Sequence, residues 1–366
     1  MKIISTSYIN TPGFSDPQRW LDRISFYTGI LEEMAKDQQV ESIEQIRYSG
    51  ILKHRRVTYH FLNFKKSRLH FPGRLHTFIK KLNPDVVLVN GLIFPAQVIQ
   101  LRLKLGKRVK IILLHRGEKP YRGVKRLLQK LADSMVDAYL FTSAEFGNEW
   151  MEFGNISDEN KVHEVIQASS VFHVGDSNAA RTALHITGSP VFLWVGRLNT
   201  NKDPLTIVKA FLSFVKFQPG AKLYMIYQTD ELLTQIKDLI ASKGDGSNAI
   251  ELVGRIPHAA LQNWYNAADF IISGSHHEGS GIAVCEGMSC GCIPLVTDII
   301  SFRKMTGPGK CGLVYEPGND AALLKILMQM RELDMEMERE KTLEQFNREL
   351  SFPAVAKKIH KIINKL

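Results

Sequence analysis

The stretch VFLWVGRLNTNKDPLTIVKAFLSFVKF, from Val191 to Phe217, decides the fold class of this chain. Its first part, Val191–Val195, is short and wholly apolar, which predicts a buried β-strand. Its last part, Pro204–Phe217, has the apolar spacing of a helix, and a polar loop of eight residues joins the two. A strand that passes directly into a helix is the unit from which parallel α/β sheets are built.

The same alternation continues on both sides of this stretch. Further short apolar strands are expected at Lys2–Ser5, Pro84–Gly91, Lys110–His115, Ala138–Ser143, Lys222–Tyr227, Ile250–Val253, Phe270–Ser273 and Ile293–Val296, with Lys161–Gln167 either a strand or an irregular run. Helices are expected near Trp20–Asp37, Lys125–Ser134, Glu231–Lys243, Ala259–Ala267, Gly281–Met288 and Ala354–Leu366. Repeated strand–helix units of this kind predict parallel sheets.

A polar, turn-rich stretch at His173–Gly188 divides the alternation into two blocks. We therefore expect an α/β chain of two doubly wound parallel-sheet domains that face one another, residues 1–172 and residues 173–351. Ligands of such sheets bind outside the carboxyl ends of the strands, so the cleft between the domains is the expected pocket.

The composition excludes several classes of protein. The chain has 366 residues, of which 44% are hydrophobic and 23% charged, which is not the composition of a disordered chain. No apolar run approaches the roughly 18 residues that span a bilayer, and the first residues do not read as a signal peptide. Four cysteines do not make a disulfide framework. These features lead us to expect a soluble protein of the cytoplasm.

The net charge of +10 is unevenly distributed. Between Arg47 and Lys130 there are 21 lysines and arginines but only two acids, Asp85 and Glu118. One interpretation is a solvated basic face; the other is a field that attracts an anionic partner, such as lipid headgroups, a phosphate-bearing acceptor or nucleic acid. No nucleic-acid-binding motif is present, so no specific nucleic acid is expected.

Two cations lie in the loop after the strand Val191–Val195. Arg197 and Lys202 are five residues apart, where an arginine fork and a lysine charge suit a diphosphate. The alternative is that they are ordinary surface cations.

A second motif, SGSHHEGSGIAVCEGMSCGCIP, occupies residues 273–294. Its two carboxylates, Glu278 and Glu286, are eight residues apart and enclose a small-residue loop, Gly279–Gly281, that opens a helix. Backbone N–H groups in such a loop and at a helix start favour an anion, whereas carboxylates accept hydrogen bonds from sugar hydroxyls. A nucleotide sugar has both kinds of group. We expect Glu286 about a turn and a half inside the helix, on the side that faces the cleft.

These motifs resemble those of the retaining glycosyltransferases of family 4, the group 1 transferases of GT-B fold. The resemblance covers roughly residues 191–320 and rests on an ordered set of motifs. They are Gly196-Arg197 with Lys202, Gly254-Arg255-Ile256, Ala267-Ala268-Asp269, Glu278 and Glu286 with Gly291–Pro294, and Gly312–Gly318. The GT-B fold implies two Rossmann-like domains facing across a cleft, with the last helix, residues 352–366, packed on the first domain.

The resemblance also implies a role for each matching residue. Arg197 and Lys202 would bind the donor diphosphate and stabilise the leaving group, Glu278 would contact the donor sugar, and Glu286 would hold the ribose. The remaining donor contacts would come from the backbone: Gly279, Ser280, Gly281 and Ile282 for the sugar and phosphate, and Arg255 and Ile256 for the base.

In the first domain the resemblance is thinner. His115 matches a histidine that lies over the donor sugar in the family; the alternative is a packed or surface histidine. Gly13 stands where relatives carry a pair of glycines facing the phosphates. This sequence departs from the family pattern at Ser280, where an aromatic residue is usual, and at Gly287, where alanine is usual.

The implied reaction is the retaining transfer of a sugar from a UDP- or GDP-linked donor to an acceptor hydroxyl, in polysaccharide, lipopolysaccharide or glycolipid synthesis. No cofactor is expected, and no Asp-x-Asp triplet indicates a metal. Two alternatives are a degenerate GT-B protein that only binds nucleotide sugar or glycan, and a basic scaffold for membrane or nucleic acid. A third, a glycan phosphorylase, lacks a suitable lysine context for pyridoxal.

The acceptor is expected to be a glycan or a lipid-linked molecule recognised by the basic first domain. This domain is expected to hold the protein at the inner face of the membrane, with Arg55, Arg56, Lys65, Lys66 and Arg68 as a candidate contact cluster. The oligomeric state is left open.

Overall fold

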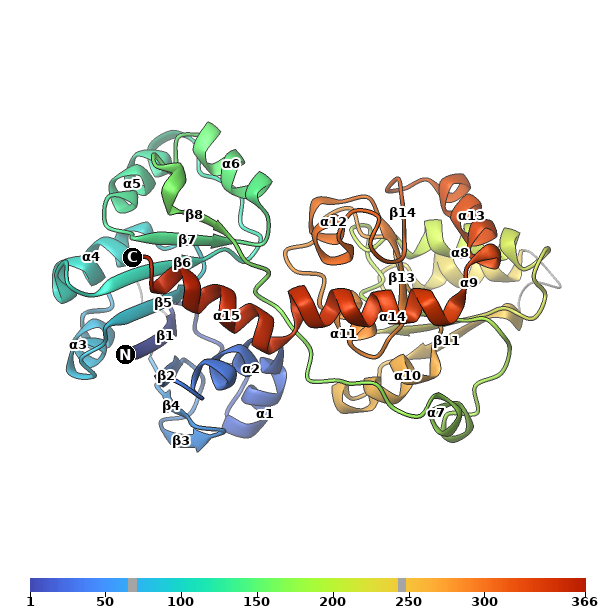
Figure 1. The fold of residues 1–366 in the computed structure, drawn as a ribbon, viewed down its shortest axis with the longest axis horizontal. Coiled ribbons are helices and arrows are strands. Elements are labelled where there is room, and N and C mark those ends of the chain that lie inside the picture. The colour runs from blue at the N-terminus through green and yellow to red at the C-terminus, as the bar shows by residue number, and fades with distance from the viewer. Residues whose placement is uncertain (65–70, 243–247) are drawn as a thin grey trace. The chain divides into compact units, whose positions relative to one another are not determined.

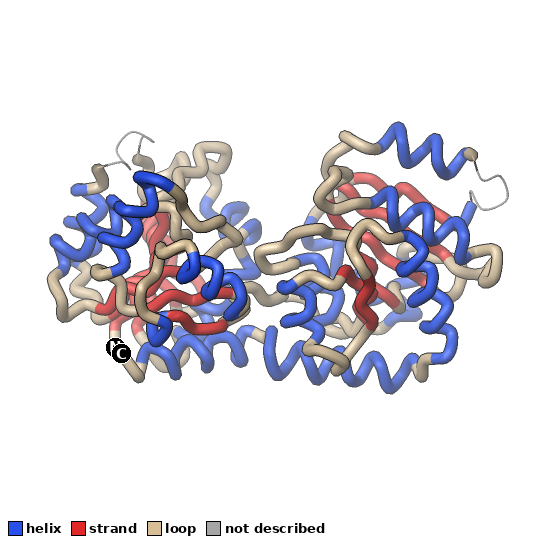
Figure 2. The backbone as a smooth tube through the Cα atoms, turned by 90° about the horizontal axis from the view of Figure 1, so that it is seen from above, coloured by secondary structure: helices blue, strands red, loops and turns tan. Residues whose placement is uncertain are grey.

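The computed structural model describes residues 1–64, 71–242 and 248–366 and divides the chain into two compact units (Figure 1). Unit 1 consists of Met1–Ser169 and Phe352–Leu366, and unit 2 of Ser170–Ser351. In both, strands are enclosed by helices (Figure 2), so the predicted α/β class is confirmed.

Unit 1 contains an eight-stranded sheet of order β3-β4-β2-β1-β5-β6-β7-β8. Its strands are β1 (Lys2–Ser7), β2 (Gln39–Glu44), β3 (Gly50–His54), β4 (Val57–Phe61), β5 (Val86–Asn90), β6 (Lys110–Leu114), β7 (Ala138–Phe141) and β8 (Val162–Glu164). All neighbours pair in parallel except β3, which is antiparallel to β4. The strands β2, β3 and β4 are not among those predicted from the sequence.

Polar residues interrupt the apolar pattern of β2, so this strand is not predicted from the sequence. Glu41 is buried in this strand, where it pairs with Lys2 Nζ at 2.8 Å and with His60 Nε2 at 2.6 Å. Glu44 Oε2 accepts a hydrogen bond from the indole of Trp20 at 2.9 Å. These partners come from distant parts of the chain, so the strand is stable although its sequence looks polar.

Helices cover both faces of this sheet. They are α1 (Pro17–Arg23), α2 (Ser25–Met34), α3 (Gly73–Lys81), α4 (Pro95–Leu105), α5 (Gly123–Asp133), α6 (Ala144–Glu152) and α15 (Phe352–Ile363). One apolar core contains residues of α2 and α15, and another contains residues of α3, α4 and α6. The single helix expected near Trp20–Asp37 is two helices, because the backbone leaves helical geometry at Ile24.

The helix α15 packs on α2 through a close contact. Gly29 of α2 has no side chain, and the ring of Phe352 fills that space: a Cβ built on Gly29 would lie 2.3 Å from Phe352 Cζ. The buried residues Val355, Ala356 and Ile359 continue this contact along α15.

Unit 2 contains a six-stranded parallel sheet of order β11-β10-β9-β12-β13-β14. Its strands are β9 (Val191–Gly196), β10 (Lys222–Tyr227), β11 (Ile250–Gly254), β12 (Phe270–Ser273), β13 (Ile293–Thr297) and β14 (Leu313–Tyr315). Its helices are α7 (Ser177–Ala183), α8 (Pro204–Phe214), α9 (Leu233–Ala241), α10 (Leu261–Ala267), α11 (Ile282–Ser289), α12 (Ile300–Thr306), α13 (Asp320–Gln329) and α14 (Met335–Gln345).

The helix α7 lies inside the stretch that the sequence analysis treated as turns. Asp176 caps its first turn by accepting from Ala179 N at 3.0 Å. Arg181 fixes it to the connection between α10 and β12, donating to Ala267 O and Asp269 Oδ1, both at 2.8 Å. A helix this short depends on such tertiary contacts rather than on its own periodicity.

The contact between α15 and α2 predicts that one substitution changes thermal stability in opposite directions in two backgrounds. Gly29→Ala should lower the midpoint of thermal unfolding by about 2–4 °C per kcal/mol lost, because the new methyl group collides with Phe352. In a Phe352→Ala background the same substitution should raise the midpoint, because alanine is the better helix former. Calorimetry of the four chains measures the coupling, and a loss of equal size in both backgrounds would contradict it.

Candidate functional site

The centre of the unit 2 sheet brings two loops together. Strands β9 and β12 are neighbours, with Phe270 opposite Phe192, and the chain order reverses between them. In chain order these strands form the 3-2-1-4-5-6 arrangement of a doubly wound sheet, whose ligands bind at this reversal. The loop after β9 carries Arg197 and Lys202, and the loop after β12 carries Glu278.

Hydrogen bonds and a close approach join the two loops. His276 N donates to Asn201 O at 2.8 Å, and Asn201 Nδ2 donates to His277 O at 3.0 Å. Gly274 permits the approach, since a Cβ there would lie 2.9 Å from Asp203 O. The loops therefore form one surface at the carboxyl edge of the sheet.

Lys202 and Glu278, 76 residues apart, form an ion pair on this surface. Ser275 Oγ also donates to Glu278 Oε1, at 2.7 Å. Two residues that the sequence singled out separately therefore meet. A diphosphate bound here would share the ammonium group of Lys202 with Glu278.

Arg197 differs from Lys202 because its side chain is exposed. Within the described residues, no hydrogen bond or ion pair involves its guanidinium group. It is available to grip an anionic ligand without breaking a protein contact.

The loop from Gly279 to Ile282 turns into α11 through a left-handed residue. Gly281 has φ +54°, and a Cβ there would lie 2.7 Å from Phe302 Cε1. Ser301 Oγ donates to Glu278 O and Thr297 Oγ1 to Ser275 O, which holds the preceding loop in place. The start of α11, where a helix carries N–H groups that favour an anion, is thereby held in a fixed position.

A small cavity of about 20 Å³ lies beneath this turn, with Lys202, Glu278 and Phe302 among its walls. It has room for about one water molecule. A nucleotide would therefore bind over the loops rather than inside this cavity.

Glu286 lies on α11 and is buried, at 5% exposure. Its Oε1 is 2.6 Å from His258 Nε2, and its Oε2 accepts from Tyr265 Oη at 2.9 Å. Burial and the neighbouring Glu286 raise the pKa of Tyr265, so this hydroxyl stays a donor.

His258 and Tyr265 are not among the site residues predicted from the sequence. His258 follows Ile256 by two residues, and its ring lies 4.9 Å from that of Phe172. The one feature of the sequence that could have indicated His258 is its position just after the expected base-binding residues Arg255 and Ile256. His258 is exposed and contacts Glu286, so a ribose that binds Glu286 would compete with this imidazole.

Arg255 and Ile256 lie at the same edge of the sheet. Arg255 Nη2 donates to Gln228 O, just beyond β10, at 2.8 Å, and Ile256 is partly buried. The loops after β11, β10, β9 and β12 therefore follow one another along the carboxyl edge of the sheet.

In unit 1 the two predicted residues follow β1 and β6. Gly13 is in an exposed turn, with no atom within 4 Å of a Cβ built there. His115 is only 2% exposed; its Nε2 lies 2.8 Å from Glu118 O and its ring lies 4.8 Å from that of Phe141. This geometry favours the alternative of a packed histidine, and a contact with the donor sugar stays a prediction.

The residue after His115 is partly buried and was not singled out from the sequence. Arg116 lies 4.7 Å over the ring of Tyr27 and donates to Asn90 Oδ1 and Gln167 O. Burial lowers its pKa. It ties the ends of two strands together near His115.

The basic cluster expected at the membrane is only partly described. Arg55 and Arg56 form the exposed β3–β4 turn, beside a groove of about 590 Å³ that Glu32, Glu33 and Asp37 also line. Arg55 pairs with Glu32 at 3.3 Å. Local acids therefore balance this turn, while Lys65, Lys66 and Arg68 lie outside the described residues.

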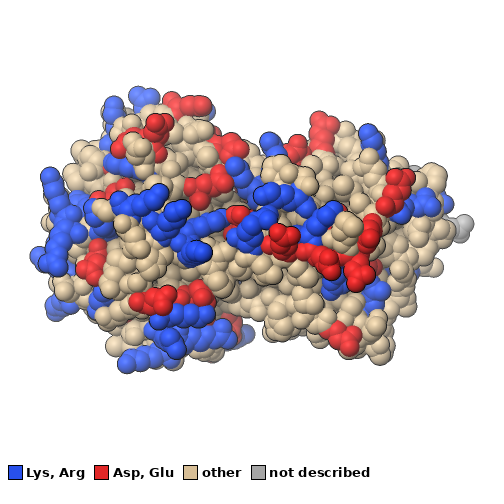
Figure 3. All heavy atoms as spheres, in the orientation of Figure 1, with Lys and Arg blue, Asp and Glu red and all other residues tan. Residues whose placement is uncertain are grey.

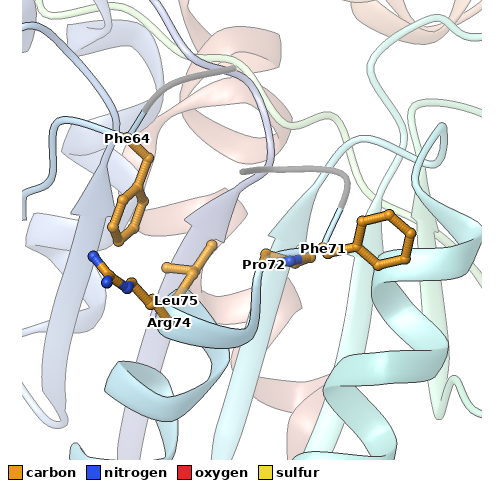
Figure 4. A pocket seen from close by; sticks show the side chains of 5 residues that line it. All are labelled: Phe64, Phe71, Pro72, Arg74 and Leu75. Atoms are coloured by element: carbon orange, nitrogen blue, oxygen red, sulfur yellow. The ribbon is translucent and has the colours of Figure 1, made fainter. Parts of the chain in front are cut away.

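A separate cavity of about 160 Å³ in unit 1 is lined by Phe64, Phe71, Pro72, Arg74 and Leu75 (Figure 4). Arg74 points toward Phe64, whereas the ring of Phe71 points away from them. We assign it no ligand.

The described residues contain neither a metal-ligand cluster nor an exposed thiol. No group of three His, Cys, Asp or Glu residues lies close enough there to hold a metal ion. All four cysteines are buried, and burial raises the pKa of Cys290 and of Cys311 to about 12. No helix in the described part of the chain is long and apolar enough to cross a bilayer.

Solved structures share this fold over the full length of the chain. The Anabaena protein Alr3699/HepE, solved in complex with UDP, superimposes with a TM-score of 0.73 over 100% of both chains at 13% identity. Two α/β units, each built on a largely parallel sheet, make up a GT-B fold. Residues 176–349 match the family described as "Glycosyl transferases group 1". The match covers most of unit 2 and just under half of the chain.

Curated relatives are distant. The D-inositol 3-phosphate glycosyltransferase of Thermobispora bispora is 23% identical over 60% of this chain and 54% of its own length. The GDP-mannose:cellobiosyl-diphosphopolyprenol alpha-mannosyltransferase of Xanthomonas oryzae pv. oryzae is 27% identical over 35% of this chain and 34% of its own length. The chain spans between 36% and 57% of the first three curated relatives that it matches.

The turn at Gly281 gives a stability prediction with a matched control. Gly281→Ala should cost about 1–2 kcal/mol for the left-handed backbone and about 1–3 kcal/mol more for the collision with Phe302. Gly309→Ala has the same backbone requirement, φ +69°, but open space around it. Thermal unfolding should show the larger loss for Gly281→Ala; equal losses would mean that the contact with Phe302 adds nothing.

Proposed function

We propose that this protein is a retaining, metal-independent glycosyltransferase of family 4 that moves a sugar from a nucleotide-diphosphate donor to an acceptor hydroxyl. One observation carries the proposal: Lys202 and Glu278, from distant parts of the sequence, meet beside the exposed Arg197 at the strand reversal of unit 2. Cations, a carboxylate and a helix start on one surface match the phosphates and hydroxyls of a nucleotide sugar.

The chemistry follows from where charge develops. As the bond between the sugar and the diphosphate breaks, negative charge grows on the leaving phosphate and positive charge on the sugar ring. Arg197, Lys202 and the N–H groups at the start of α11 would stabilise the former, since groups already in place lose little energy in reorganisation. Glu278 would position the sugar through its hydroxyls. We assign no residue as a general base for the acceptor hydroxyl. The leaving phosphate would therefore take the proton of that hydroxyl.

Glu286 would hold the ribose once His258 has moved aside. The imidazole and a ribose hydroxyl are both hydrogen-bond donors, so one can replace the other at Oε1. Arg255 and Ile256 would contact the base.

The relatives support the substrate classes. HepE was solved with UDP, and the Xanthomonas relative is named for GDP-mannose, in line with a UDP- or GDP-linked donor. The acceptors in the two relatives' names, an inositol phosphate and a diphosphopolyprenol, both carry phosphate. We propose a phosphate-bearing or lipid-linked acceptor, a role in cell-surface polysaccharide, lipopolysaccharide or glycolipid assembly, and action in the cytoplasm, at the membrane face.

Arg197→Ala is the sharpest test of the donor site. It should weaken binding of UDP or GDP about 10- to 100-fold, the value of a charge-assisted hydrogen bond, without lowering stability. Titration calorimetry measures this, with Lys209→Ala as the control, an exposed lysine on α8. Equal nucleotide affinity in both variants would contradict the assignment of the diphosphate site to this surface.

Transfer itself needs a second readout. Incubation with sugar nucleotides and phosphate-bearing acceptors, followed by NMR of the anomeric proton, should show the donor configuration retained in the product. Nucleotide binding without transfer or donor hydrolysis would favour the degenerate binding protein instead.

A further inference from the structure

The helix α5 presents its apolar residues to solvent. In GVKRLLQKLAD, Val124 is 83% exposed, Leu127 62%, Leu128 39% and Leu131 53%. The face that packs on unit 1 consists instead of Gln129, Ala132 and Asp133, all fully or almost fully buried. A soluble protein normally turns such a stripe inward, so this face has no explanation in the folding of unit 1.

Cations border the stripe on both sides. At 3.6 residues per turn, Lys130 and Arg126 lie along one edge and Lys125 along the other, and all three are exposed. The one acid in the helix, Asp133, is buried and accepts hydrogen bonds from Tyr139 and Ser157. The exposed surface of α5 is therefore purely apolar and basic.

The neighbouring helix extends this surface. α4 packs beside α5, and near its end Leu103 is 74% exposed and Lys104 is exposed. Lys107 and Arg108 follow, also exposed. In the space-filling view, Lys and Arg side chains gather at the outer edge of unit 1 that carries α4, and also line the surface of α15 (Figure 3).

We propose that α5 binds the surface of an anionic lipid bilayer, with Val124, Leu127, Leu128 and Leu131 among the lipid chains and Lys125, Arg126 and Lys130 at the headgroups. A helix with an apolar face edged by lysine and arginine is suited to lie in the plane of such a surface. Protein interfaces are instead depleted in lysine and enriched in aromatic residues, which this stripe lacks. Nucleic acid would account for the cations but not for the leucines.

The position of α5 gives this contact a consequence. The helix starts at Gly123, eight residues after His115, which lies at the carboxyl end of β6. Its first turn therefore lies near the edge of the unit 1 sheet at which ligands of parallel sheets bind. A bilayer that holds α5 brings this edge to the lipid surface, independently of which nucleotide unit 2 takes.

The test uses the full chain and two kinds of vesicle. The protein should co-sediment with phosphatidylcholine vesicles that contain about a quarter phosphatidylglycerol, and more weakly with vesicles of phosphatidylcholine alone. Its binding to the anionic vesicles should fall as the salt concentration rises from about 0.1 M to about 0.5 M. Leu127→Gln with Leu131→Gln should lower partitioning about tenfold for each leucine. Lys125→Gln, Arg126→Gln and Lys130→Gln together should lower it about a hundredfold at low salt.

Two matched controls separate the helix from general charge and hydrophobicity. Lys357→Gln, Lys361→Gln and Lys365→Gln remove three exposed cations from α15 and the residues just after it, and Phe217→Gln removes an exposed apolar side chain from unit 2. Both should bind vesicles more tightly than the α5 variants. All substitutions are at exposed positions, so thermal unfolding should stay within a degree or two of the parent chain.

Three outcomes would overturn the proposal. They are no binding to the anionic vesicles, binding that the leucine substitutions leave unchanged, and a dimer in light scattering that the same substitutions disperse while vesicles are not bound. The last would assign the stripe to a second copy of the chain. Nucleotide affinity, measured on the same variants, should not change, so failure here is distinguishable from failure of the donor site.

Discussion

The approach of the loops after β9 and β12 is the constraint on which the site depends. The two strands are neighbours in the sheet although two strands and three helices separate them in sequence. Their loops can close on one another because Gly274 has no side chain to meet Asp203 O. Lys202 and Glu278 are then within reach of one another, and Arg197 is left exposed beside them. A larger residue at position 274 would separate the cations from the carboxylate before affecting the rest of the unit.

The parts of the fold that the sequence predicts are those where local pattern and tertiary role agree. Lys222–Tyr227 was predicted and observed with the same bounds because its apolar run is buried on both faces of a parallel sheet. The strand β2 was missed because Glu41 and Glu44 interrupt its apolar pattern, and their partners Lys2, His60 and Trp20 are not recognisable beforehand. Long-range pairing of buried polar groups leaves no local signature.

The candidate site divides in the same way. Spacing and residue type identified Lys202, Glu278 and Glu286, but neither gives exposure. Glu286 is covered by His258 and Tyr265, which come from the loop after β11 and from α10. His115 lies at the end of a strand, as expected, yet its ring packs among aromatic residues that follow it in the chain. A motif names the residue, whereas its burial depends on neighbours that only the fold supplies.

The helices α5 and α15 show the limit of amphipathic pattern as an argument. Both alternate apolar and basic residues, and both were expected as helices. α15 buries its apolar face, including Val355 and Ile359, against unit 1, whereas α5 turns Leu127 and Leu131 outward. The difference is set by what each helix meets: α15 meets Gly29 and the apolar face of α2, while α5 meets unit 1 through Gln129 and the hydrogen-bonded Asp133. Because the inner face of α5 is polar, its apolar face has no partner within the described part of the chain. In the membrane contact proposed above, the basic excess of this domain would select an anionic lipid surface over an uncharged one.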